Sequence, residues 1–284
     1  MRYISFKLGD RRTYGIMHEG GIIDLGDRFK ASLPDLNSYL QALASGFSLP
    51  RFPSSLRDCT VNDIIYEPVC SPNKIICVGM NYEKHRQETG RNKTEYPTLF
   101  SRFPETLIGH RSSIVRPRVS TELDFEGELA VVIGRSGRRI PSQKALSFIA
   151  GYSCFNDGSI RDWQRHTHQF LPGKNFSATA PFGPELVTPE ELGPLESLQI
   201  ETRLNGVVMQ SALLGEMIFP VAEIIEYIST FITLDPGDVI ATGTPGGVGV
   251  KREPPVFMKS GDTVEVIVEE VGHLINDVVE EPVS

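Results

Sequence analysis

The chain has 284 residues, of which 40% are hydrophobic and 23% are charged, so its composition is globular and excludes a disordered or fibrous protein. The net charge is −8 and no Lys/Arg-rich run is present, which argues against a nucleic-acid partner. No apolar stretch reaches the roughly 18–20 residues of a membrane span, so we expect no membrane partner. The N-terminal residues lack the apolar core of a signal peptide and the four cysteines are scattered, which favours a cytoplasmic protein with reduced thiols.

The first seventy residues predict a small β-rich domain. Residues 1–27 alternate apolar and polar side chains in short runs broken by glycine turns, which is typical of a meander. Residues 33–45 predict a short helix. Prolines recur between residues 50 and 72 and indicate a loop-rich joint. We therefore place a small N-terminal domain at residues 1–70 and a second domain at residues 71–284.

The second domain mixes strands and helices in irregular order. Residues 74–79, 129–134, 238–243 and 262–271 predict strands by composition. Residues 217–232 carry apolar side chains with a helical period. Because strands and helices do not alternate strictly, the sequence predicts an α+β, β-rich fold and argues against a doubly wound parallel sheet.

Two glutamates stand at the start of the apolar run of residues 129–134. Glu126 and Glu128 are two positions apart, and side chains at that spacing share one face of a strand. Carboxylates placed so close repel each other unless water or a cation separates them, and Mg²⁺ or Mn²⁺ prefers oxygen ligands. The pattern allows a divalent-metal site, while a solvated strand face is the plainer explanation, and both stay open.

Asp157 offers a third carboxylate, although Asn-Asp-Gly-Ser is more often a turn or a helix cap. If a helix begins at Asp157, then Arg161 and Gln164 follow at i+4 and i+7 and lie on the same face. A carboxylate, a cation and an amide would then point together, which would suit a metal ion and an oxygen-rich substrate.

His85 and Glu88 follow the predicted strand at residues 74–79, in a polar segment that ends at Gly90. In a helix they are i and i+3 neighbours, and a carboxylate beside an imidazole orients it and raises its basicity, as a general base requires. A surface His–Glu pair in a charged helix is the alternative interpretation.

Two further segments carry candidate ligand contacts. Lys174 lies in a stretch that predicts an irregular loop, where a lysine is usually a solvated charge. Residues 242–250 are Gly-rich and follow a strand, but no helix opens behind them, so a dinucleotide-binding fingerprint fails. Backbone N–H groups of this loop and Thr244 remain candidates for contact with an anionic ligand.

Six segments together resemble the fumarylacetoacetate hydrolase family, in the branch labelled 2-hydroxyhepta-2,4-diene-1,7-dioate isomerase-like or acylpyruvase-like. They stand in the family's order across residues 74–280 and read CVGMNYEKHRQE, FEGELAVVIG, NDGSIRDWQ, GKNF, LNGVVMQ and LDPGDVIATGTPGGVG. The resemblance implies a mixed β-sandwich roll around the site, a small N-terminal domain and a homodimer.

The resemblance also implies roles for single residues. The metal ligands, for one Mg²⁺ or Mn²⁺ per subunit, would be Glu126, Glu128 and Asp157. The catalytic residues would be His85 and Glu88, which activate water, and Lys174, which stabilises an oxyanion. The residues that contact a small anionic oxo-acid substrate would be Arg161, Gln164, Thr244 and Tyr82.

The chain departs from the family pattern at two places. Arg102 stands in FSRF where many relatives carry lysine. Residues 158–160 are Gly-Ser-Ile, where many relatives carry Val or Met after the aspartate. We expect both differences to change substrate contacts more than the metal site.

These features predict a divalent-metal-dependent hydrolase that cleaves a carbon–carbon bond of a 2,4-dioxo acid such as an acylpyruvate, a reaction of aromatic catabolism. Water activated by His85 and Glu88 would attack the 4-carbonyl, and a metal-stabilised pyruvate enolate would leave. Two alternatives stay open. An oxaloacetate decarboxylase or 2-hydroxydienoate isomerase would need no attacking water, and a non-catalytic metal- or ligand-binding protein would keep the site without turnover.

Overall fold

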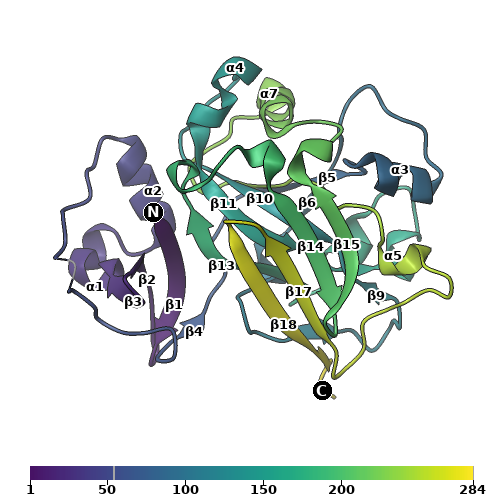
Figure 1. The fold of residues 1–284 in the computed structure, drawn as a ribbon, viewed down its shortest axis with the longest axis horizontal. Helices are drawn as coiled ribbons and strands as arrows, with labels where there is room; N and C mark the ends of the chain where they lie inside the picture. Colours follow the sequence, from purple (N-terminus) through teal and green to yellow (C-terminus); the bar gives the residue numbers. More distant parts are fainter. Residues whose placement is uncertain (54, 284) are drawn as a thin grey trace.

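The computed structural model describes residues 1–53 and 55–283, in which two sheets pack against each other (Figure 1). The larger sheet has the strand order β3-β2-β1-β13-β11-β10-β16-β5-β6, with β4 beside β1 and β7 beside β13. Its strands are β1 (Arg2–Leu8), β2 (Arg11–His18), β3 (Gly21–Asp24), β4 (Ile65–Tyr66), β5 (Ile75–Gly79), β6 (Thr98–Arg102), β7 (Leu107–Ile108), β10 (Gly127–Ile133), β11 (Ile149–Asn156), β13 (Ala180–Val187) and β16 (Val239–Ala241).

The smaller sheet runs β15-β14-β17-β18-β8, and a separate pair joins β9 to β12. These strands are β8 (Ile114–Arg116), β9 (Leu123–Asp124), β12 (Ser159–Ile160), β14 (Gln199–Leu204), β15 (Val207–Leu213), β17 (Thr263–Val268) and β18 (Gly272–Glu280). The α-helices are α1 (Leu25–Phe29), α2 (Leu36–Ala44), α3 (Glu83–Thr89), α4 (Ser142–Ala145), α5 (Arg161–Gln164), α6 (Leu171–Lys174) and α7 (Val221–Phe231). Among the described helices, none combines the length and the apolarity that crossing a bilayer takes.

The N-terminal strands continue the large sheet. β1, β2 and β3 form the predicted antiparallel meander, and β1 also pairs with β13, where Arg2 lies opposite Val187. Helix α2 begins where the side chain of Asp35 accepts a hydrogen bond from the Ser38 N–H, which satisfies one free donor of the first turn. Tyr39 on α2 is buried against this sheet extension. The boundary near residue 70 stays a prediction.

Strand β10 lies inside the large sheet, between β11 and β16, and is buried along its whole length. Leu129 and Val131 face a core that includes α7 and the inner face of the smaller sheet. Ala130 and Val132 face the other core, which the N-terminal helix α2 helps to cover. Because both faces are covered, residues 129–133 of the strand are all apolar. The polar residues Glu126 and Glu128 stand at its N-terminal end.

The fold confirms the predicted α+β, strand-rich class and its sandwich of mixed sheets. The sequence left open a helix from Asp157, and none begins there: the Asp157 N–H donates to the carbonyl of Glu126, and Ser159–Ile160 form β12. Helix α5 begins only at Arg161. The irregular loop predicted around Lys174 is also wrong, since α6 makes one helical turn there with a proline at its start, a position that tolerates a missing N–H.

Candidate active site

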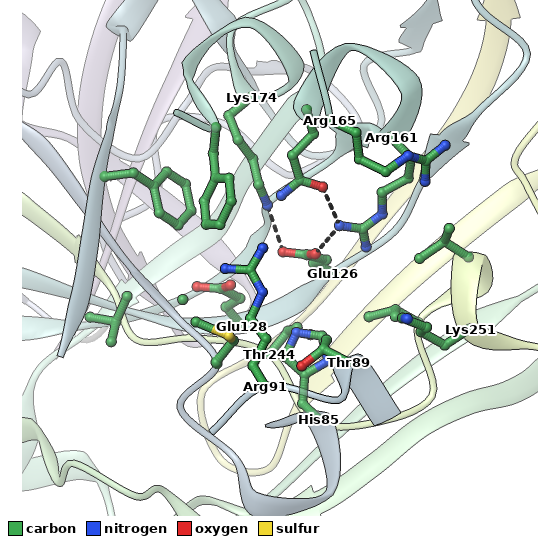
Figure 2. A pocket seen from close by; sticks show the side chains of 18 of the residues that line it. His85, Thr89, Arg91, Glu126, Glu128, Arg161, Arg165, Lys174, Thr244 and Lys251 are labelled. Carbon is green, nitrogen blue, oxygen red and sulfur yellow. Dashed lines mark hydrogen bonds and ion pairs between the residues drawn. The ribbon is translucent and has the colours of Figure 1, made fainter. Parts of the chain in front are cut away.

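One cavity of about 540 Å³ gathers most of the predicted site residues from distant parts of the chain (Figure 2). Helix α3, the start of β10, helices α5 and α6 and the Gly-rich loop of residues 242–250 all contribute to its wall. The predicted residues that line it are His85, Glu126, Glu128, Arg161, Gln164, Lys174 and Thr244. A cavity of this size fits a small metabolite.

Three buried carboxylates meet at the inner end of this cavity. Glu126, Glu128 and Asp157 each offer an oxygen, and these oxygens all lie within 4.8 Å of one another. The sheet explains the meeting: β10 and β11 are antiparallel partners with Gly127 opposite Asn156, so the start of one strand and the end of the other coincide. Because all three side chains are buried, the interpretation as a solvated strand face is wrong.

Cations surround two of the three carboxylates. Lys174 Nζ lies 2.7 Å from Glu126 Oε2 and 2.5 Å from Asp157 Oδ2. Arg161 Nη1 lies 2.6 Å from Glu126 Oε1, and Arg102 Nη1 lies 2.6 Å from Asp157 Oδ1. A dashed line in Figure 2 marks the pair of Arg161 with Glu126. Burial by itself would raise the pKa of Glu126, but Lys174 and Arg161 prevail and lower that pKa. Burial opposes the charge of Lys174 as well, yet Asp157 and Glu126 raise the pKa of its ammonium.

Glu128 is the carboxylate that fits a metal ion best. It is 1% exposed, accepts a hydrogen bond from the Gly243 N–H at 2.8 Å, and makes no ion pair with the described residues. Burial first, then the charges of Asp157 and Glu126, raise its pKa well above the ordinary value. A divalent cation would replace the proton that this environment favours, and three carboxylates are the ligands that Mg²⁺ or Mn²⁺ prefers. The residues present therefore fit such an ion.

His85 and Glu88 form a hydrogen-bonded pair on α3 at the edge of the same cavity. His85 Nδ1 lies 2.7 Å from Glu88 Oε1, and Glu88 Oε2 accepts a hydrogen bond from the Gly247 N–H at 2.9 Å. The carboxylate makes Nδ1 the protonated nitrogen and leaves Nε2 to exchange a proton with a ligand. His85 is buried and lines the cavity, so the alternative of a surface pair is wrong.

The Gly-rich loop uses its backbone on the protein's own carboxylates. Its N–H groups at Gly243, Gly247 and Gly249 donate to Glu128, Glu88 and Asp124 respectively. These hydrogen bonds place the loop against both the carboxylate cluster and the His85–Glu88 pair. Thr244 lines the cavity, but its hydroxyl donates to the carbonyl of Gly127 and accepts from the amide of Gln210.

Tyr82 lies apart from the other predicted residues. Its ring is buried in the core with α7, and its hydroxyl has no hydrogen-bond partner among the described residues. Arg102 also differs from expectation, because its guanidinium contacts Asp157 Oδ1 and thus touches the carboxylate cluster.

Sequence reasoning missed Asp124 and Gln210, two fully enclosed polar residues beside the site. Asp124 stands two residues before Glu126, and Gln210 ends the segment LNGVVMQ. Gln210 lies inside a recognised segment and Asp124 stands directly before one, but their partners Thr244 and Arg161 are more than thirty residues away in the chain.

Comparison with known proteins agrees with this fold. The family model described as Fumarylacetoacetate (FAA) hydrolase C-terminal matches residues 74–279. A Bos taurus protein named oxaloacetate tautomerase FAHD2A, mitochondrial, is 41% identical over 266 residues, covering 92% of this chain and 84% of that protein.

Two solved structures are similar over almost the whole chain. The fumarylacetoacetate hydrolase of Exiguobacterium antarcticum has a TM-score of 0.86 and 33% identity, covering 99% of this chain and 100% of that one. The 2-hydroxyhepta-2,4-diene-1,7-dioate isomerase of Mycobacterium marinum has a TM-score of 0.79 and 31% identity, covering 100% of both chains. This chain belongs to the fumarylacetoacetate hydrolase family, which confirms the resemblance of its six segments.

Proposed function

We propose that this protein is a divalent-metal-dependent enzyme that interconverts the keto and enol forms of oxaloacetate or a closely related 2-oxo dicarboxylic acid. The charge of the cavity wall carries this proposal. Five lining side chains are permanent cations, namely Arg91, Arg161, Arg165, Lys174 and Lys251. Arg161, Arg165 and Lys174 pair with carboxylates of the protein, whereas Arg91 and Lys251 make no ion pair with the described residues. Such a wall suits a substrate with two negative charges. The similarity to a protein named oxaloacetate tautomerase supports the choice of reaction.

The metal would be one Mg²⁺ or Mn²⁺ per subunit, held by Glu126, Glu128 and Asp157. When bound it supplies a Lewis acid that polarises the oxo group of the substrate. Lys174 fixes two of these carboxylates through its 2.5 and 2.7 Å contacts, so the ligand oxygens are set before substrate enters.

His85 is the group that moves a proton in this reaction. In the direction from keto to enol, the carbon beside the oxo group loses a proton to His85 Nε2, and the electrons of that C–H bond form the carbon–carbon double bond. The π electrons of the oxo group move onto its oxygen, and His85 gives the proton to that oxygen. Glu88 keeps the imidazole oriented, because its carboxylate lies 2.7 Å from Nδ1. Arg161 lies beside Glu126 and offers a fixed cation to a substrate carboxylate.

A second candidate is the hydrolysis of an acylpyruvate. The same His85–Glu88 pair favours it, since an imidazole backed by a carboxylate activates water as readily as it abstracts a carbon-bound proton. The two functions differ in product: tautomerisation releases nothing, whereas hydrolysis releases pyruvate and a carboxylic acid.

The test uses one protein preparation and two assays. The decay of enol-oxaloacetate is followed by its ultraviolet absorbance, and pyruvate release is measured from a panel of acylpyruvates, each with Mg²⁺, with Mn²⁺ and with EDTA. We expect EDTA-sensitive acceleration of enol decay and little pyruvate. EDTA-sensitive pyruvate release from an acylpyruvate, with no effect on enol decay, would overturn the tautomerase and support the hydrolase.

The assembly and the cellular location are separate proposals. We propose a homodimer, as the family resemblance implies, and sedimentation equilibrium would test it by giving the mass relative to 31.5 kDa per chain. A cytoplasmic location stays a prediction, and fractionation of cells with an antibody to the chain would test it.

A further inference from the structure

Asp124 is a completely buried carboxylate beside the cavity whose every acceptor position is used. Its Oδ1 accepts from the N–H groups of Phe125 and Gly249, both at 2.8 Å. Its Oδ2 accepts from the Val250 N–H at 2.9 Å and from Arg161 Nε at 2.8 Å. A carboxylate has about four lone-pair sites, so Asp124 has no capacity left for a ligand or a metal. Its role must be exerted through the groups it holds.

The first of these groups is the guanidinium of Arg161. Nε is held by Asp124, while Nη1 is held by Glu126 at 2.6 Å and by Gln164 at 3.0 Å. The remaining nitrogen, Nη2, is buried and has no partner among the described residues. Because the guanidinium is planar, two fixed nitrogens determine where the third one points. Asp124 therefore aims the unpaired donor of a side chain that lines the cavity.

The second group is the backbone of the Gly-rich loop. Gly249 and Val250 donate to the two oxygens of Asp124, and the neighbouring Val248, Val250 and Lys251 form part of the cavity wall. Asp124 thus ties the loop side of the cavity to Arg161 on α5.

Gly249 is shaped for this contact. A Cβ at Gly249 would lie 2.5 Å from Asp124 Oδ1 and 1.9 Å from the carbonyl oxygen of Val256, closer than real Cβ atoms approach other atoms. The backbone can approach the carboxylate only because the side chain is absent. The close approach and the filled acceptor set are independent observations of the same anchor.

We propose that Asp124 is a positioning residue that sets the distance between the guanidinium of Arg161 and the loop wall, and thereby the affinity for the carboxylate groups of a metal-chelating ligand. The proposal rests on the proposed function for the class of ligand. Asparagine keeps the shape of the side chain but replaces one of the two oxygens by an NH2 group, which is a donor. Each oxygen of Asp124 accepts from two N–H groups, so the NH2 group would face two donors and accept from neither. Asp124→Asn therefore loosens Arg161 or the loop without removing any carboxylate of the metal cluster.

The experiment measures binding, so it does not depend on turnover. Mn²⁺ affinity is measured by titration of the metal-free protein, and the affinity of the Mn²⁺-loaded protein for oxalate, an unreactive dicarboxylate that chelates divalent ions, by calorimetry. The variants are Asp124→Asn, which changes the carboxylate, and Gly249→Ala, which adds a Cβ where the backbone of the loop contacts it. The matched control is Asp262→Asn, because Asp262 is also buried and accepts from the Lys259 N–H, at a turn outside the cavity wall.

We expect Asp124→Asn and Gly249→Ala each to weaken oxalate binding at least tenfold while Mn²⁺ affinity stays within twofold of the wild type. Asp262→Asn should lower the melting temperature and leave oxalate binding unchanged. Oxalate affinity that is unchanged in both anchor variants, or that falls only together with Mn²⁺ affinity, would overturn the proposal. Oxaloacetate turnover by the wild type is assayed separately, so failure of the proposed function is distinguished from failure of the anchor.

Discussion

The inner and outer ends of the cavity are held by different interactions. At the inner end, Lys174 and its carboxylate partners are almost fully buried and paired at 2.5–2.7 Å. At the outer end, the Arg165 side chain is 56% exposed where it pairs with Glu122, and Arg91 lies over the ring of Phe170 at 5.2 Å. Breaking one partner of a buried pair costs about 3–5 kcal/mol, whereas an exposed pair contributes about 0–1 kcal/mol. The side chains at the inner end are therefore held in one arrangement, whereas those at the outer end can move when a substrate binds.

The largest expected effect is on metal-dependent activity. Glu128→Gln removes a predicted metal ligand, and we expect activity to fall by about 10³-fold or more, since Lewis-acid polarisation is worth several kcal/mol. EDTA should inhibit the wild type to the same extent, and added Mn²⁺ should restore only the wild type. Glu122→Gln makes the same change at the outer end and should alter activity by less than about threefold. Equal loss in both variants would contradict the division into two ends.

The second effect is on stability. Lys174→Met leaves Glu126 and Asp157 without their shared cation, so we expect the free energy of unfolding to fall by about 3–5 kcal/mol. Arg165→Met removes an exposed cation, and the expected loss is below about 1 kcal/mol. Urea unfolding of the two variants measures both values. Similar losses would show that burial does not separate the two ends.

The third effect is on the catalytic step alone. His85→Ala removes the proposed proton carrier, and we expect kcat to fall by about 10²–10⁴-fold with a small change in Mn²⁺ affinity. His168 also lines the cavity but is exposed, so His168→Ala should change kcat only slightly. Full activity in His85→Ala would refute the general-base assignment for either candidate reaction.

The fourth effect is on the pH dependence of stability, and it separates the carboxylates at the inner end from His110, which lies outside the cavity wall. Burial lowers the pKa of His110 to about 4, and its Nδ1 accepts a hydrogen bond from the Ile275 N–H. The unfolded chain therefore binds this proton between pH 6.5 and about 4 when the folded protein does not, so stability falls as pH drops through that window. After allowance for partial solvent access the loss is about 2 kcal/mol.

His110→Asn keeps an acceptor and should remove this loss when unfolding is measured between pH 4 and 7. The lowered pKa of Glu126 affects stability at lower pH than His110 does. The charge of Glu126 stabilises the folded protein above the ordinary carboxylate pKa, and this contribution is lost only below that pKa. If the stability of His110→Asn still fell with pH above pH 5, the carboxylates at the inner end would be taking up protons at higher pH than their ion pairs imply.

The sequence alone determined the N-terminal meander, the strands β5, β10, β16 and β17, the long helix and the residue types of the site. Periodicity placed α7, and the apolar run after Glu128 identified β10, because local burial patterns do not depend on distant partners. The order of six short segments identified the family, since each segment carries its chemistry in consecutive residues.

Only the tertiary structure decided which side chains meet. The sequence allowed Asp157 to stand in a turn, at a cap or at the start of a helix, and the structure places it beside Glu126 because the end of β11 meets the start of its antiparallel partner β10. Lys174 seemed a solvated loop charge, yet α6 buries it between two carboxylates. For Asp124 the only sequence signal was its place directly before a recognised segment, because its partners Arg161 and Gly249 are 37 and 125 residues away in the chain. Local sequence fixes what a segment prefers, but the energy of a buried charge depends on neighbours that only the folded chain supplies.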